Sequence, residues 1–105
     1  MSEGLLDWIA EVSGVQTAVI GGLDGLMIDG RGDRGGFDLL AAFGAQLLTV
    51  GNRLSPAEDD GLSSVTAEWR DQVVVARRLT DQTNLVVALR RKSNAAYVMY
   101  LVDRN

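Results

Sequence analysis

The first apolar positions of the chain recur at the spacing of one helical face. They follow the pattern i, i+3, i+4, i+7 and are Leu5, Trp8, Ile9 and Val12. This spacing is typical of an amphipathic helix. Ser2 suits the N-terminus of such a helix, and Gly14 suits the position just after its end. The sequence therefore predicts a first helix near residues 3–13.

The next segment combines β-branched residues with turn residues. The run VQTAVIGG (15–22) precedes Asp24-Gly25, which precedes LMID (26–29). Asp-Gly between two apolar runs is a strong signal of a β-hairpin, so we expect the turn at Asp24 and Gly25. We expect the following GRGDRGG (30–36) to be a loop. A phosphate-binding loop would need a helix after its glycines, whereas a second strand follows here.

The segment FDLLAAFGAQLLTVGNRL (37–54) is the clearest helix, and it carries two apolar stripes. One stripe consists of Phe37, Leu40, Ala41, Gly44, Leu47, Leu48 and Gly51. The adjoining stripe consists of Leu39, Ala42, Phe43, Val50 and Leu54. An amphipathic helix on a protein surface needs only one such stripe. We therefore expect this helix to be covered on two sides.

Three β-rich runs fill most of the second half of the chain. Before them, SPAE (55–58) has the pattern of a helical capping box and predicts one short turn. The run 62–70 alternates between two faces, whereas 73–79 and 85–91 are almost continuously apolar. Continuous apolar runs are typical of strands that are covered on both faces of a sheet. The links between the three runs have hairpin length and predict a meander.

The last segment of the chain is compatible with either a helix or a strand. Ser93 or Asn94 would cap a short last helix, whereas the tyrosines and valines of AAYVMYLV (95–102) equally suit a strand. With a helix there, the element order is α-β-β-α-β-β-β-α. We expect an α+β fold in which one five-stranded antiparallel sheet has helices on both faces. A single domain would span residues 1–105.

The composition excludes most kinds of active site. The 105 residues include no cysteine and no histidine, and Lys92 is the only lysine. Disulfide scaffolds, zinc sites with thiolate or imidazole ligands, cysteine nucleophiles and serine–histidine triads are therefore excluded. Glu68 would do acid–base chemistry only if the fold paired it with Asp71 or Asp81. The acidic residues of 24–33 lack the spacing of a calcium loop. We expect no catalytic residue, no cofactor and no metal.

The charge of the chain bears on its partners and its location. The formal net charge is −4 and the sequence pI is about 4.6. An acidic domain is a poor ligand for nucleic acid and for anionic membranes. The longest apolar run, 95–102, is too short to span a bilayer. The first residues lack the features of a signal peptide, so we expect a cytoplasmic protein without membrane insertion.

Arginines gather near the ends of two predicted strands. Arg77 and Arg78 stand near the end of one strand, and Arg90 and Arg91 stand near the end of the next. If the fold brought these ends together, they would form a patch for an acidic partner protein. The simpler interpretation is that they keep the sheet ends soluble and pair with nearby acids.

The second apolar stripe of the helix 37–54 has two interpretations. Either another element of the same chain covers it, or it meets a second copy or a partner. Small domains bury little surface alone, so we favour the interface. Its expected helix residues are Phe37, Leu40, Ala41, Gly44, Leu47 and Leu48, with Val65, Ala67 and Trp69 in support. On this interpretation, Gly44→Glu or Leu48→Glu breaks the assembly.

Most of the chain resembles the Roadblock/dynein light-chain-7 family. The stretches that carry the resemblance are GVQTAVIGGLDGLMID (14–29), the helix 37–54, EWRDQVVVARRL (68–79) and NLVVALRR (84–91). The Asp24-Gly25 turn is its sharpest point. Two departures are Gly21 and Gly22, which stand where larger residues are usual, and the last helix looks short.

The resemblance implies a homodimer in which the long helices pack together and the third strands pair into one sheet. The half-polar run 62–70 suits that strand. The family's prokaryotic members are non-catalytic partners of Ras-like small GTPases, and some activate the GTPase without supplying an arginine finger. We therefore expect a homodimeric module that binds a small Ras-like GTPase and modulates its nucleotide cycle. The alternative is a small-ligand sensory domain of a prokaryotic signalling system.

Overall fold

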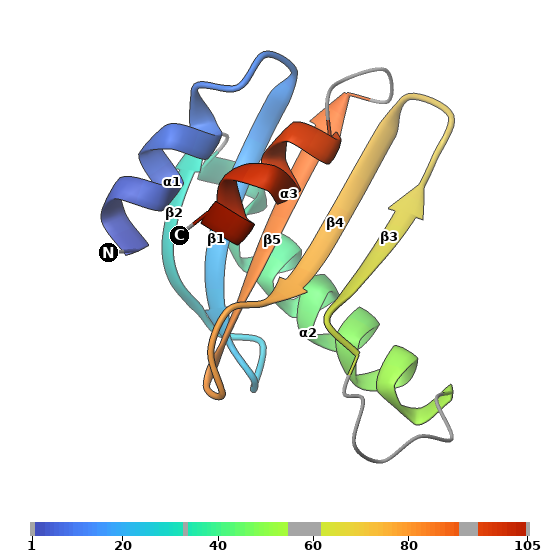
Figure 1. Ribbon diagram of the computed structural model, residues 1–105. Coiled ribbons are helices and arrows are strands. Elements are labelled where there is room, and N and C mark those ends of the chain that lie inside the picture. The colour runs from blue at the N-terminus through green and yellow to red at the C-terminus, as the bar shows by residue number, and fades with distance from the viewer. Residues whose placement is uncertain (1, 33, 55–61, 91–94, 105) are drawn as a thin grey trace.

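The computed structural model describes residues 2–32, 34–54, 62–90 and 95–104. Five strands form one antiparallel sheet in the order β2-β1-β5-β4-β3. They are β1 (Val15–Gly22), β2 (Met27–Gly32), β3 (Ser64–Glu68), β4 (Gln72–Arg78) and β5 (Thr83–Arg90). The helices are α1 (Ser2–Ala10), α2 (Phe37–Leu54) and α3 (Ala95–Arg104). Helices α1 and α3 cover one face of the sheet and α2 covers the other (Figure 1). The predicted α+β fold and element order are confirmed.

The apolar core lies in two layers, one on each face of the sheet. Strand β5 is the central strand, and all its residues from 84 to 89 are buried. Leu85, Val87 and Leu89 belong to the layer under α1 and α3. Val86 and Ala88 belong to the layer under α2. Because successive side chains of a strand point to opposite faces, a central strand covered on both faces is apolar throughout.

The first hairpin turns where the sequence predicts, although by a different turn geometry. The backbone N–H of Gly22 donates to the carbonyl of Leu26, and the Asp24 carboxylate accepts from the Leu26 N–H at 3.0 Å. A two-residue type I′ turn would need positive φ at both central residues. Here Gly25 has φ of +86°, and no non-glycine residue of the described chain has positive φ. Asp24 therefore stabilises the turn through its side chain and Gly25 through its backbone.

The predicted loop at 30–36 is wrong for its first half. Residues 30–32 continue β2, because Gly30, Arg31 and Gly32 pair with Val19, Ala18 and Thr17 of β1. A short 3-10 helix, Arg34–Gly36, then leads into α2. Glycine is unfavourable within a strand, so the sequence pattern does not predict that β2 extends to Gly32.

Two glycines of the hairpin allow α2 to lie close against it. A Cβ built on Gly21 would lie 3.2 Å from the Cβ of Ala41, and one on Gly25 would lie 3.3 Å from the Cα of Ala42. A larger residue at either position would push α2 away from the hairpin. Glycine at position 21 therefore accompanies a close packing of hairpin and helix.

The remaining element boundaries differ only slightly from the predictions. Helix α1 ends at Ala10, and a turn follows in which Val12 donates its N–H to the carbonyl of Ile9. The last element is a helix, α3, so the alternative of a final strand is wrong. The predicted capping box at 55–58 and the predicted caps at 93–94 lie outside the described residues.

One ion-pair cluster joins α1 to β2. The Nε of Arg31 donates to Asp7 of α1 at 2.7 Å, and its Nη1 donates to Asp29 of β2 at 2.8 Å. The hydrogen bond that Arg31 donates to Asp7 raises the pKa of Arg31, and the one that it donates to Asp29 raises this pKa further. Exposed ion pairs contribute little to global stability, so we expect this cluster to hold α1 locally.

Arg31→Met tests this local role. We expect amide hydrogen exchange in α1 to become faster by about twofold to fivefold, because the exposed ion pair with Asp7, which joins α1 to β2, is lost. Exchange in the central strand β5 should stay unchanged. The matched control is Arg53→Met, at an exposed arginine in the last turn of α2. Equal exchange in α1 of both variants and the wild type would show that apolar packing alone holds the helix.

Candidate functional site

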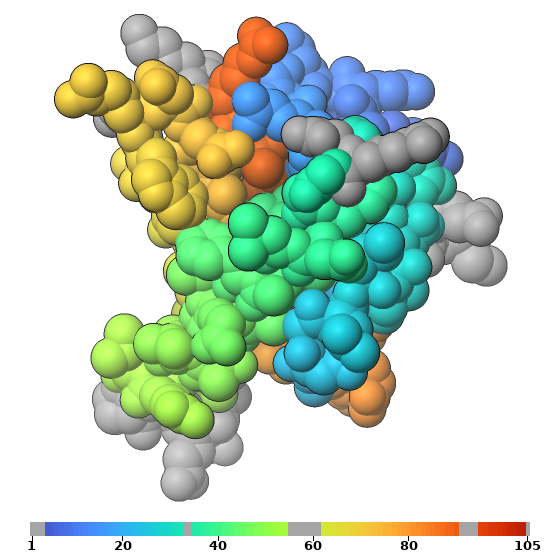
Figure 2. All heavy atoms as spheres, turned by 180° about the vertical axis from the view of Figure 1, so that it is seen from behind, coloured from blue at the N-terminus to red at the C-terminus, as the bar shows by residue number. Residues whose placement is uncertain are grey.

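The outward face of α2 exposes three large apolar side chains among polar ones. Leu39 is 76% exposed, Val50 is 52% exposed and Leu54 is 81% exposed. These residues belong to the second of the two apolar stripes in the sequence. In Figure 2, α2 (green) crosses the face behind the sheet, with the first hairpin on one side and β3 (yellow) on the other. Neighbouring exposed apolar side chains of this kind mark sites of protein interaction.

The stripe predicted to form the interface faces the protein's own sheet instead. Ala41, Gly44 and Leu48 are buried. A Cβ built on Gly44 would overlap Cγ2 of Val86 in β5. In the single chain these three residues offer almost no surface to a partner, and their place in an interface stays a prediction. Three other predicted residues are partly buried at the margin of this stripe: Phe37, Leu40 and Leu47.

Strand β3 forms an edge of the sheet beside this helix. It pairs only with β4, from Ser64 opposite Arg77 to Glu68 opposite Val73. Val65 and Ala67 are half-buried on the α2 side, and Trp69, just after the strand, is 47% exposed. The apolar side of β3 thus lies beside α2, with Trp69 exposed just after the strand. An edge strand also has backbone groups free to pair with another strand.

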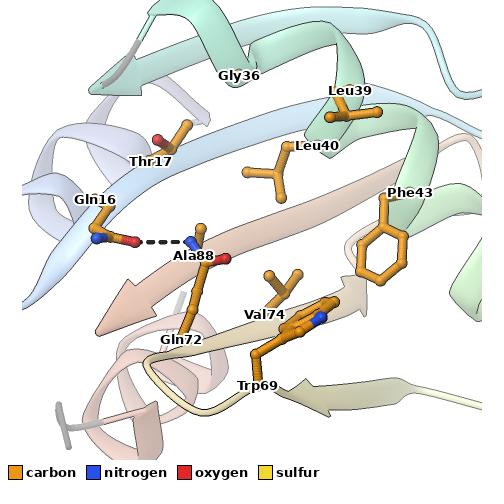
Figure 3. A pocket seen from close by; sticks show the side chains of 10 residues that line it. All are labelled: Gln16, Thr17, Gly36, Leu39, Leu40, Phe43, Trp69, Gln72, Val74 and Ala88. Atoms are coloured by element: carbon orange, nitrogen blue, oxygen red, sulfur yellow. Dashed lines mark hydrogen bonds between the residues drawn. The ribbon is translucent and has the colours of Figure 1, made fainter. Parts of the chain in front are cut away.

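A groove of about 620 Å³ lies between the first half of α2 and the sheet. Figure 3 shows three polar side chains at one end of it and two aromatic rings at the other. Its lining residues are Gln16, Thr17, Gly36, Leu39, Leu40, Phe43, Trp69, Gln72, Val74 and Ala88. None of these residues carries a charge. The groove therefore suits an uncharged, largely apolar group.

Each end of the groove has a defined geometry. At the polar end, Nε2 of Gln72 donates to Oε1 of Gln16 at 2.8 Å (Figure 3). Gln16 lies where the pairing of β1 with β5 shifts register, between Val15 and Thr17. At the aromatic end, the rings of Phe43 and Trp69 have their centroids 5.6 Å apart and are tilted by 48°. Tilted rings at this distance attract each other edge to face.

The described arginines of the predicted patch lie at opposite ends of the paired strands. Arg78 of β4 lies opposite Asn84 at the start of β5, whereas Arg90 lies opposite Gln72 at the start of β4. Antiparallel pairing thus separates the two groups by about 20 Å along the sheet, at roughly 3.3 Å per residue. Arg77 forms an ion pair with Asp103 of α3. Arg91 lies outside the described residues.

Of the carboxylates considered for acid–base chemistry, Asp81 lies apart from Glu68 and Asp71. Glu68 and Asp71 lie near the start of β4, whereas Asp81 lies in the turn beyond its end. Among the described residues that line the groove there is no carboxylate. Within the described residues, no group of three or more His, Cys, Asp or Glu is placed to hold a metal ion. In the same part of the chain, no helix is long and apolar enough to cross a membrane.

The sequence matches no family model and no curated protein. The structure is similar to a Roadblock/LC7 domain from Streptomyces avermitilis, with 23% identity, a TM-score of 0.82, and coverage of 97% of this chain and 85% of that one. An MglB structure with a tetrameric arrangement has 12% identity and a TM-score of 0.83, with 98% and 80% covered. MglC from Myxococcus xanthus has 19% identity and a TM-score of 0.68, with 99% and 92% covered. The resemblance is confirmed as a likeness of fold.

Proposed function

From the Roadblock/LC7 fold of this chain, we propose that it is a non-catalytic, homodimeric regulatory module. It would bind a small Ras-like GTPase and modulate the nucleotide cycle of that GTPase. One observation carries the proposal: α2 exposes three large apolar side chains and lies beside the edge strand β3, which has an exposed tryptophan just after it. Pairing of two β3 edges would cover both surfaces in a single symmetric contact.

The residues of this contact differ from those expected from the sequence alone. We propose Leu39, Val50 and Leu54 on α2, together with Val65, Ala67 and Trp69 at the β3 edge. Exposed leucines and valines on a monomer carry a cost in water that association removes. The tetrameric arrangement of MglB, a protein of the same fold, supports association between copies.

The proposed partner follows from the family resemblance, and the proposed lack of catalysis follows from the site. The described residues that line the groove beside α2 offer amide, hydroxyl and apolar groups but no ionised side chain. General acid–base and nucleophilic catalysis need titratable or activated groups within reach of a substrate. A GTPase bound here would therefore be regulated through its conformation rather than supplied with a catalytic group.

A small-ligand sensory domain is the second candidate, and the groove favours it. Its volume of about 620 Å³ lies in the range of ligand sites, about 300–1,000 Å³. A sensor would bind its metabolite as a monomer and would show a raised melting temperature in a metabolite screen. The regulatory module would instead sediment as a dimer, and a GTPase would co-purify with it from its native cell.

The direct test has two measurements. Sedimentation velocity at micromolar concentration should give the mass of a dimer, and a monomer there would contradict the homodimer. Co-purification from the native cell, followed by an assay of nucleotide hydrolysis or exchange on any recovered GTPase, tests the partner. Failure to recover any GTPase would favour the sensory candidate.

Trp69 gives an optical test of the proposed contact. In a Trp8→Phe variant, Trp69 is the only tryptophan, and it is 47% exposed in the single chain. We expect its emission maximum to move to shorter wavelength as concentration rises, because a second copy would exclude water from the indole. The matched control, Trp69→Phe, keeps Trp8 on α1 and should show no shift. A concentration-independent spectrum of Trp69 across the dimerisation range would place the contact elsewhere.

A further inference from the structure

We infer that Asp29 and Arg31 close the β2 edge of the sheet to strands of other copies, so that only the β3 edge is left open to pairing. The two edges lie on opposite sides of the sheet (Figure 1). Two open edges would let copies add without limit, whereas pairing of one edge with its own copy stops at a dimer. The inference goes beyond the proposed function, because it concerns the edge that the proposed contact does not use.

The β2 edge carries apolar side chains that would favour association. Leu23 and Leu26 in the turn, and Met27 and Ile28 at the start of the strand, are exposed. An exposed apolar edge strand is a site at which chains aggregate unless charged side chains or a bulge protect it. The β2 edge therefore needs protection if the chain is to form a closed assembly.

The register of β1 with β2 identifies the backbone groups that face outward from this edge. The N–H of Gly22 in β1 donates to Leu26, so the even-numbered residues of β1 direct their backbone groups toward β2. Gly30 lies opposite Val19, an odd-numbered residue. In such a pair, neither residue bonds to the other, and the groups of the edge residue point away from the sheet. A further strand would have to bond to the N–H and the carbonyl of Gly30.

Side chains of the same strand already occupy both groups of Gly30. Its N–H donates to Oδ1 of Asp29 at 2.8 Å, and its carbonyl accepts from Nη1 of Arg31 at 2.9 Å. The same Nη1 donates to the same Oδ1 at 2.8 Å, so the three residues form one closed set of hydrogen bonds. A strand added here would have to displace two charged side chains from their partners, which costs more than breaking neutral bonds.

The neighbouring outward positions of β2 also interrupt the edge. Ile28 is the extra residue of a β-bulge, because the register with β1 shifts there. Gly32 has φ of +105°, far from the extended backbone of a strand. With Gly30 bonded between them, β2 offers no continuous row of groups to a second strand. Within the described residues, by contrast, no side chain bonds to the backbone of β3, Ser64–Glu68.

The double variant Asp29→Ala/Arg31→Ala tests the inference, since it frees both groups of Gly30 and keeps the net charge. In sedimentation velocity we expect a species of about twice the wild-type mass or more, because freed β2 edges pair. The matched control is Arg77→Ala/Asp103→Ala, which removes the exposed ion pair between β4 and α3. The control should keep the wild-type mass. A double variant that keeps the wild-type mass at its highest soluble concentration, or equal growth of the control, would overturn the inference.

Amide hydrogen exchange of Gly30 shows whether this edge is the one that pairs. In the wild type, the bond to Asp29 should slow its exchange by about fivefold or more relative to an unfolded chain. The dilute double variant should lose this protection and regain it as concentration rises, because a strand of another copy then accepts the N–H. An unprotected Gly30 in the wild type, or in the larger species, would contradict the inference. If the double variant does not fold, Arg31→Met, which frees only the carbonyl, takes its place in sedimentation.

The wild-type measurements separate this inference from the proposed function. A monomeric wild type contradicts the proposed homodimer alone, provided that the double variant associates through Gly30. A dimeric wild type whose double variant stays a dimer overturns the inference alone. If Gly30 of the wild type gains protection only as the dimer forms, the β2 edge itself makes the contact. That result would overturn both the inference and the proposed contact at β3.

Discussion

Gly44→Glu is expected to prevent folding of the chain rather than to break an assembly. Gly44 is buried where α2 meets the sheet, and even a Cβ at this position would overlap Val86 of the central strand. Glutamate would add this steric conflict to the cost of a buried charge without a partner. Together they amount to about 5 kcal/mol or more, comparable with the whole stability of a small domain. Circular dichroism and the yield of soluble protein measure the loss.

Two alanine variants separate steric conflict from helix propensity. Gly44→Ala adds only a methyl group, yet we expect it to lower the free energy of unfolding by about 1–3 kcal/mol through overpacking. Gly4→Ala makes the same change in α1, where a Cβ meets nothing within 4 Å. It should raise stability by about 0.5–1 kcal/mol, because alanine favours a helix over glycine. A stable Gly44→Ala would mean that α2 does not approach β5 so closely.

Val50→Glu is expected to leave the fold intact and to dissociate the proposed dimer. Val50 is 52% exposed on the outward face of α2, so the monomer can keep the glutamate in water. In a symmetric contact, both copies would bury the new charge against an apolar surface. We expect the dissociation constant to rise by about a hundredfold or more, the equivalent of about 3 kcal/mol. Sedimentation velocity over a dilution series measures this change.

Ile28→Glu is the matched control for Val50→Glu. Ile28 is 60% exposed, but it lies on β2, the edge of the sheet opposite β3. The Ile28→Glu variant should keep both the fold and the mass of the dimer unchanged. If Ile28→Glu dissociates the dimer and Val50→Glu does not, the contact uses the β2 edge instead of α2 and β3.

Much of the fold could be predicted because its periodic signals are strong. The helix predicted at 37–54 has the observed bounds of α2, Phe37–Leu54. The apolar runs at 73–79 and 85–91 correspond to β4 and β5. Each of these strands has a neighbouring strand on both sides and is buried on both faces of the sheet. The prediction failed in segments rich in glycine, such as residues 30–32. Their strand propensity is low, but they form a strand because they pair with β1.

The candidate site was harder to predict, since it depends on which side of α2 faces inward. Small residues such as Ala41 and Gly44 allow close packing against any neighbour, whether a sheet or a second helix. Periodicity identified both stripes but contains no information about this choice. The groove adds a second difficulty, because Gln16 and Gln72 are far apart in the sequence and meet only through a register shift in β1.

The central position of β5 has a consequence for biosynthesis. Strand β1 pairs with β5, so the N-terminal hairpin and the β3–β4 hairpin remain unjoined until the ribosome has released residues 83–90. Until then, the apolar faces of α1, α2 and β1 have no sheet to complete their burial. Contacts between such distant parts of a chain slow folding and prolong the exposure of apolar surface. The nascent chain is therefore most prone to aggregation just before its last strand emerges.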